Sequence, residues 1–198
     1  MNATKGERRR RELLDIAYRL FIQKGYEKTS IDDIITRANI AKGTYYYYFP
    51  SKEATLEAVI DMLINYAAER ARILVSEPIP VTQKAAAVIK QLRPGREESG
   101  IVDTLNKEEN ILMHEKINRR MIEMAVPILT EIVKEGIAQG VFCCTNVEER
   151  VKMLLIMSRH LFDSNGHTEK DIEVFIDMAE KTLGAEKGTM DFIREVIG

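Results

Sequence analysis

The sequence has 198 residues, of which 29 are Lys or Arg, 31 are Asp or Glu, and 45% are hydrophobic. This composition excludes a disordered or collagen-like chain, and the length excludes a disulfide-stapled miniprotein. No apolar run approaches the ~18 residues of a membrane helix, no signal-peptide core follows the basic start, and the two adjacent cysteines give no disulfide framework, which together predict a cytoplasmic protein.

The charge is unevenly distributed along the chain. Residues 1–53 hold eleven basic and seven acidic side chains, a net of +4, whereas residues 54–198 hold 18 basic and 24 acidic ones, a net of −6. The overall charge of −2 taken alone argues against a nucleic-acid partner. A basic head on an acidic body instead predicts that only the head meets a polyanion. The run Arg8 to Arg11 also fits a solvated charge cluster at a frayed terminus, so it does not decide the matter.

Helical periodicity covers the first part of the chain. Apolar residues at helical spacing from Leu13 to Phe21 predict a helix that ends at Gly25. Thr29-Ser30 precedes two acidic residues and opens a short second helix that stops near Asn39. A third short element covers about 41–49. Pro50 blocks its continuation, and a long fourth helix is expected from Ser51 to about Ser76.

The remainder also reads as helical. Helices are predicted at 81–92, 102–139, 147–162, 168–183 and 189–197, with loops at 77–80, 94–100 and 163–166. Pro127 predicts a kink or a restart inside the longest of these helices. No strand-like alternation and no internal repeat occur. We therefore predict an all-α fold.

The chemistry is concentrated between residues 26 and 53. Two short helices joined by a tight turn predict a helix-turn-helix, whose second helix enters the DNA major groove. On a helical wheel, Tyr45, Tyr48 and Phe49 group inward, while Gly43, Tyr46 and Tyr47 face outward. Four consecutive tyrosines cannot all face a core, which favours a polar partner over a purely structural role. The candidate DNA contacts are Thr29, Ser30, Lys42, Gly43, Thr44, Tyr46, Tyr47 and Lys52.

A family resemblance rests on this same segment. Lys42-Gly43-Thr44, followed by Tyr46, Phe49 and Ser51-Lys52-Glu53, resembles the signature of the TetR family of bacterial and archaeal transcriptional repressors. The segment from Glu135 to Phe142 is similar to one common in the second domain of that family. The resemblance implies a homodimer with a DNA-binding head at 1–53 and an effector-binding and dimerisation domain at 54–198. It also implies that Thr29 or Ser30, Tyr46, Tyr47 and Lys52 contact phosphates, with Lys42, Gly43, Thr44 and Tyr46 nearest the bases.

Three residues depart from the family pattern. Asn39 stands where glycine is common, and asparagine tolerates the left-handed conformation that the turn needs. Ala41 replaces a usual Ser or Thr, so the recognition helix loses its side-chain N-cap. Tyr45 replaces a usual leucine, so the core must accommodate a ring and satisfy its hydroxyl.

The last two long helices, at 147–162 and 168–183, are apolar on more than one face. Such helices are buried on more than one side, which fits a four-helix interface between two chains but also fits the core of a monomer. With the resemblance added, we expect a dimer. The expected interface residues are Val151, Leu154, Leu155, Met157, Phe162, Phe175 and Met178.

The effector site is less evident in the sequence. Along the 102–139 helix, a methionine-rich stripe with one histidine predicts an adaptable pocket wall, although such a stripe also occurs in ordinary cores. Cys143-Cys144 fit either a thiol sensor or small buried hydrophobes. The three histidines lack metal-ligand spacing, so no metal and no cofactor are expected. The candidate effector residues are Met113, His114, Ile117, Met121 and Met124.

These features predict a TetR-like repressor. It would bind a pseudo-palindromic operator as a homodimer and be released by a small-molecule effector, without a membrane partner. The alternative is an effector-independent DNA-binding scaffold that recruits a protein partner. No nucleophile elbow, P-loop, HExxH pair or dinucleotide motif is present, so no catalytic residues and no enzyme are expected.

Overall fold

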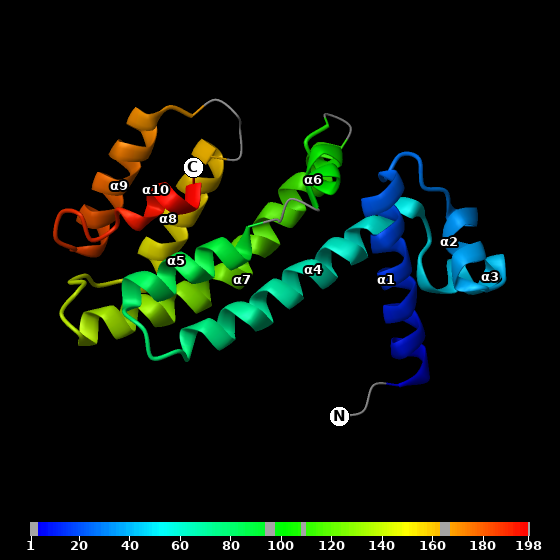
Figure 1. Cartoon of the computed structure of the whole chain (residues 1–198), viewed down its shortest axis with the longest axis horizontal. Coiled ribbons are helices and arrows are strands. Elements are labelled where there is room, and N and C mark those ends of the chain that lie inside the picture. Colours follow the sequence, from blue (N-terminus) through cyan, green and yellow to red (C-terminus); the bar gives the residue numbers. More distant parts are fainter. Residues whose placement is uncertain (1–3, 94–97, 108–109, 163–166, 198) are drawn as a thin grey trace. The chain divides into compact units, whose positions relative to one another are not determined.

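The computed structural model describes residues 4–93, 98–107, 110–162 and 167–197. Within these ranges the regular secondary structure is entirely helical, as predicted (Figure 1). The chain forms two compact units, which are described separately. The first unit comprises 1–66 and 94–118, and the second comprises 67–93 and 119–198. Because the chain alternates between them, the units do not correspond to a single cut in the sequence. The functional boundary after residue 53 stays a prediction.

The helices of the first unit begin and end where the sequence provides caps. Thr4 and Ser30 each close a capping box, with Glu7 and Asp33 respectively. Asn39 adopts the left-handed conformation with φ 49°, as expected from its place in the turn. Ala41 provides no side-chain cap, again as expected. This unit contains α1 (Lys5–Lys24), α2 (Ile31–Ala38), α3 (Lys42–Tyr48), α6 (Ser99–Leu105) and the first parts of α4 (Lys52–Val75) and α7 (Ile111–Ala138).

The core of the first unit joins α1, α2, α3 and the start of α4. Tyr45 is fully buried, and its hydroxyl lies 2.5 Å from the hydroxyl of Thr55, so the tyrosine that replaces leucine is both packed and satisfied. Phe49 is buried beside it, and the two rings are 5.9 Å apart. This core fixes the orientation of α3 relative to α1 and α2. Its other large side chains are Leu13, Leu14, Phe21, Ile34, Leu56 and Val59.

The prediction of one helix over 102–139 was wrong. Two helices occupy this part of the chain, α6 ending at Leu105 and α7 beginning at Ile111. The side-chain amide of Asn110 donates to the Thr104 carbonyl at 2.7 Å, and the Asn110 N–H donates to the Lys107 carbonyl. These bonds take up carbonyls that a continuous helix would have used. Residues 94–97 of the predicted 94–100 loop lie outside the described residues, and α6 begins before that loop was expected to end.

Pro127 does not restart α7. The helix continues through it, although proline has no N–H to donate to the carbonyl four residues earlier. Glu123 and Pro127 both lie on the exposed face, where water can satisfy the carbonyl that lacks a partner. The helix ends at Ala138, and Gly140 follows with φ 75°.

The second unit contains the ends of α4 and α7 together with α5 (Val81–Leu92), α8 (Val147–Phe162), α9 (Glu169–Leu183) and α10 (Phe192–Ile197). The bounds of α5 and α8 match their predictions, and α10 begins three residues later than expected. The predicted loop at 163–166 lies outside the described residues. Lys84 on α5 is buried and donates to both carboxylate oxygens of Glu135 on α7, at 2.7 and 2.9 Å.

The short helix α10 lies in the second unit (Figure 1), where polar contacts hold both the helix and the turn that precedes it. The buried carboxylate of Glu180 accepts hydrogen bonds from the N–H groups of Gly188 and Met190, at 2.7 and 3.1 Å. Arg194 pairs with Glu169 on α9. Arg93, at the end of α5, donates to the Val196 carbonyl. These contacts hold α10 against α5 and α9.

Candidate functional site

The outward face of α3 carries the side chains that the sequence placed there. Tyr46 is 45% exposed and Tyr47 is 81% exposed, and Gly43 is exposed as well. A side chain added at Gly43 would meet nothing within 4 Å, so the backbone is open to close approach by a partner. Lys42 is also exposed and lies 3.6 Å from Asp32 on α2. Thr44 is half-buried.

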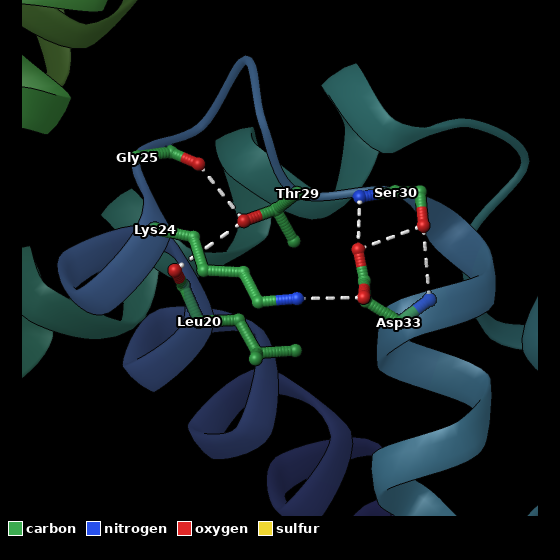
Figure 2. A network of polar contacts seen from close by, with 6 residues as sticks. All are labelled: Leu20, Lys24, Gly25, Thr29, Ser30 and Asp33. Carbon is green, nitrogen blue, oxygen red and sulfur yellow. Dashed lines mark hydrogen bonds and ion pairs between the residues drawn. The ribbon is translucent and has the colours of Figure 1, made fainter.

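The N-terminus of α2 is occupied by groups of the chain itself (Figure 2). Thr29 is buried, and its hydroxyl donates to the Gly25 carbonyl at 2.8 Å. Ser30 donates from both its N–H and its hydroxyl to the Asp33 carboxylate, at 2.9 and 2.8 Å. Lys24 donates to the other oxygen of that carboxylate at 2.7 Å. Thr29 thus supports the loop before α2, whereas Ser30 is exposed at its start.

Lys52 is directed back toward the loop between α1 and α2. Its Nζ donates to the Tyr26 carbonyl at 3.1 Å and to the Glu27 carbonyl at 3.4 Å. The same Nζ lies 4.2 Å from the centre of the Tyr26 ring, a cation–π distance. In this arrangement Lys52 joins the start of α4 to the loop that precedes α2.

Two arginines of the basic run take part in the helix-turn-helix, which sequence reasoning had not separated from a solvated cluster. Arg9 donates to the Ala38 carbonyl at the end of α2, at 3.1 Å. The Arg10 guanidinium lies 5.2 Å from the centre of the Phe49 ring. Helical spacing provided a signal, because Arg10 precedes Leu13 by three residues and Ala17 by seven on the buried stripe of α1. The two arginines therefore connect α1 to the end of α2 and to Phe49, the residue that follows α3.

A cavity of about 190 Å³ lies within the second unit. Its walls come from α5, α7, α8, α9 and α10 and from Phe142 and Met190, and they are almost entirely apolar. Of the five predicted effector residues, Met121 lines this cavity. Met113, His114 and Ile117 belong to the first unit, and Met124 packs on the core of the second. The stripe of five as an effector site stays a prediction, and the α10 part of the wall had no signal in the helical periodicity.

The expected dimer residues on α8 and α9 divide into two groups. Val151 and Phe175 are buried in the second unit's own core, and Leu154, Leu155, Met157 and Phe162 pack partly buried against it. Met178 is 41% exposed, and other apolar side chains of the same two helices are exposed as well. These exposed side chains, which we term the α8/α9 face, are Met153, Ile156, Val174 and Met178.

The adjacent cysteines differ in environment. Cys143 is exposed and Cys144 is half-buried, and burial raises the pKa of the Cys144 thiol. Within the described ranges, no helix has the length and apolarity needed to cross a membrane.

The N-terminal part of the chain matches a known protein family. The sequence model described as "Bacterial regulatory proteins, tetR family" matches residues 13–59, which run from α1 through α3 into α4. The chain is 26% identical over 195 residues to the HTH-type transcriptional repressor NicS of Pseudomonas putida, covering 94% of this chain and 90% of that protein. The chain is a TetR-family transcriptional regulator.

Other comparisons agree with this assignment. The fatty acid metabolism regulator protein of Bacillus subtilis is 29% identical over 133 residues, covering 65% of this chain and 68% of that protein. A TetR/AcrR-family regulator from Thermobifida fusca has a similar structure, with a TM-score of 0.53 and 26% identity. That likeness covers 89% of this chain and 97% of that one. In this TetR-family chain, α2 and α3 are accordingly the DNA-binding helix-turn-helix.

Proposed function

We propose that this regulator represses transcription as a homodimer bound to a pseudo-palindromic operator, and that a small-molecule effector releases it. The observation that carries the proposal is the exposed face of α3, where Gly43, Tyr46 and Tyr47 stand beside Lys42. Repression is also the role named for its relative NicS.

The proposed DNA contacts follow from exposure. Tyr46 and Tyr47 donate hydrogen bonds to phosphate oxygens, and Lys42 neutralises a phosphate near the start of α3. Gly43 and Thr44 come nearest the bases, and Ser30 is placed to contact the backbone. For two of the proposed contacts, a structural role comes before any contact with DNA. Thr29 and Lys52 bond to backbone carbonyls of the chain itself, so their first role is to hold the loop before α2 in place.

The α8/α9 face supports the proposed dimer. Four large apolar side chains exposed on two adjacent helices are a costly surface for a monomer, and two copies would cover them in a four-helix arrangement. A dimer presents two α3 helices to successive major grooves, about 34 Å or a multiple of it apart.

The cavity supports release by an effector. Ligand sites are concave and mostly apolar, and this cavity has such walls. A ligand releases DNA only if it binds the DNA-incompetent arrangement more tightly than the competent one. The helix α4 begins in the first unit and ends in the second, which makes it the proposed connection between cavity and α3. The cavity also favours this function over the scaffold alternative, for which a filled core would be expected.

The experiment compares DNA binding by matched variants on operator fragments selected from random-sequence DNA. Tyr46→Ala and Lys42→Ala are expected to weaken binding at least tenfold while remaining folded dimers. Tyr66→Ala is the control, because Tyr66 on α4 is 44% exposed, almost the same as Tyr46. Lys42→Ala should also lower the salt dependence by about one phosphate contact, a slope change near 0.9. Undiminished affinity in both variants would refute the assignment of α3.

A further inference from the structure

The cavity of the second unit has a volume and a lining that together narrow the class of ligand. We infer that it takes a neutral aromatic molecule of one or two rings. This inference rests on the proposed function, since it concerns the ligand of the same cavity.

The volume of the cavity sets the size of the ligand. It is about 190 Å³. An apolar cavity of about 150 Å³ stays dry and is large enough to bind benzene. The somewhat larger cavity of this chain therefore accommodates one ring with a short substituent, or two fused rings, with about ten non-hydrogen atoms in all.

The polar side chains on the wall do not specify a charge for the ligand. They are Arg93, Ser158 and Arg159, and each already has a partner within the chain. Arg93 donates to the Val196 carbonyl. The Ser158 hydroxyl donates to the Leu155 carbonyl at 2.9 Å. Arg159 also interacts with other groups of the chain. No Asp or Glu is found among the lining residues that the structure describes, so a cation has no carboxylate to meet there.

The rest of the wall favours a neutral ligand. A charged group placed against hydrocarbon side chains loses its hydration and gains no hydrogen bond in return. A neutral ring leaves water without that cost. It also provides dispersion contacts to wall atoms that have no partner on the cavity side when the cavity is empty.

The side chains of the wall favour an aromatic ring. Every phenylalanine of the second unit lines the cavity, and these residues come from the α7–α8 connection, α8, α9 and α10: Phe142, Phe162, Phe175 and Phe192. Phe162 and Phe175 already meet edge to face, with their ring centres 5.3 Å apart. Because such ring pairs are more favourable than their buried area alone predicts, an aromatic ligand gains contacts here that a saturated ring of similar size does not.

The first experiment measures the binding of matched probes to the full-length protein by calorimetry at neutral pH. Toluene and naphthalene are the neutral aromatic probes, and benzoate and benzylamine carry a negative and a positive charge on a ring of the same size. We expect each neutral probe to bind at least tenfold more tightly than either charged one. A charged probe that binds as tightly as toluene, or neutral rings that do not bind at all, would overturn the inference.

Two further probes test the ring and its size. Methylcyclohexane has a shape similar to that of toluene but is less soluble in water, so desolvation alone would favour it. We expect toluene to bind at least as tightly, and tighter binding of methylcyclohexane would overturn the aromatic preference. Pyrene, with four fused rings, is followed by its fluorescence and should not bind. Binding of pyrene in the cavity would refute the size limit.

Variants assign the binding to the cavity. Ala85→Leu puts a larger side chain on the wall and should weaken toluene and naphthalene at least tenfold. Ala87→Leu is the matched control, because Ala87 is half-buried on the same helix and outside the lining. Phe192→Leu removes one ring from the wall and should weaken toluene while leaving methylcyclohexane unchanged. If Ala85→Leu does not fold, the comparison of probes on the unaltered protein still decides the ligand class.

The two proposals fail in different ways. If the neutral rings bind in the cavity but do not dissociate the protein from its operator, effector release is wrong and the ligand class stands. If benzoate or benzylamine dissociates the operator complex, the neutral rings do not, and Ala85→Leu abolishes that response, effector release stands and the ligand class is wrong.

Discussion

The phenol of Tyr45 donates a hydrogen bond to the hydroxyl oxygen of Thr55 at 2.5 Å, and both side chains are fully buried. The direction follows because the single hydroxyl hydrogen of Thr55 is used at the Ser51 carbonyl, 3.0 Å away. Thr55→Val removes the acceptor and leaves a buried phenol with only a long contact to Ser51. We expect a loss of about 1–3 kcal/mol in the free energy of unfolding, measured in urea. Tyr47→Phe changes an exposed phenol and should leave that value unchanged; equal losses in the two variants would contradict the assignment.

Acid stability should depend on Asp33. Lys24 donates to its carboxylate, and Ser30 donates from its N–H and hydroxyl, which together hold the pKa of Asp33 well below its usual value of 3.8. A lowered pKa in the folded state contributes stability above about pH 4, and that contribution is lost as the pH falls toward the folded pKa. The stability difference between the wild type and Asp33→Asn should therefore be largest near neutral pH and shrink in acid. Urea unfolding from pH 2 to pH 7 measures this.

Asp32→Asn is the control for that pH series. The Asp32 side chain is 77% exposed, and its carboxylate lies 3.6 Å from Lys42. Its replacement should therefore change the pH dependence of the unfolding free energy in acid much less. A pH dependence in Asp33→Asn identical to that of the wild type would contradict the role of the capping network.

Gly184 and Gly140 should respond differently to alanine. Both have positive φ, at 65° and 75°. A Cβ at Gly184 would lie 2.0 Å from the Cys143 carbonyl oxygen, whereas one at Gly140 would meet nothing within 4 Å. Gly140→Ala should cost about 1–2 kcal/mol of unfolding free energy from the left-handed backbone alone. Gly184→Ala should cost clearly more, because the Cys143 backbone has to move. Thermal and urea unfolding compare the two, and equal losses would show that the contact carries no cost.

Removing one partner of the ion pair between the buried Lys84 and the half-buried Glu135 should cost more stability than removing both. Lys84→Met leaves the Glu135 carboxylate, whose side chain is 33% exposed, with Gln139 as its neighbour at 3.0 Å. We expect a loss of about 1–3 kcal/mol, less than for a fully buried pair because water reaches the carboxylate. The double variant Lys84→Met/Glu135→Met should recover most of that loss. A double variant that is no more stable than the single one would show that the pair contributes net stability.

The α8/α9 face should control association. Ile156→Glu puts a charge on a side chain that is 48% exposed, and two copies would have to bury it at the proposed interface. Sedimentation equilibrium should give a dimer dissociation constant at least tenfold higher for the variant than for the wild type. Ile73→Glu, on α4 with 64% exposure, is the control. Unchanged dimers in Ile156→Glu would place the interface elsewhere.

Helix positions and the inward face of α3 could be predicted from the sequence because they depend on local signals. Caps such as Ser30 and the spacing of Tyr45 and Phe49 act over a few residues. The gap between α6 and α7 could not, because it depends on the hydrogen bond of Asn110 to Thr104, and periodicity does not report such bonds. The roles of the site residues were also hard to predict, because they too depend on side-chain hydrogen bonds to backbone carbonyls. Thr29 and Lys52 have the right chemistry for phosphates, yet nearby carbonyls compete for their donors.

Periodicity also does not say which surface covers an apolar face. Val151 and Phe175 are covered by their own chain, while Ile156 and Val174 on the same two helices are exposed. The cavity is built from five helices that are distant in the sequence, so no single helical pattern contains it.

The chain alternates between two compact units, and this limits which segments can be exchanged with a relative to transfer DNA binding. The segment 94–118 belongs to the first unit, and there Lys107 pairs with Glu27 at 2.7 Å and Lys116 pairs with Glu57. A chimera that exchanges only the first 60 or so residues with a relative would therefore import one half of these pairs and retain the other. A transferable DNA-reading module of this chain is discontinuous: it needs α6 and the start of α7 to travel with the helix-turn-helix.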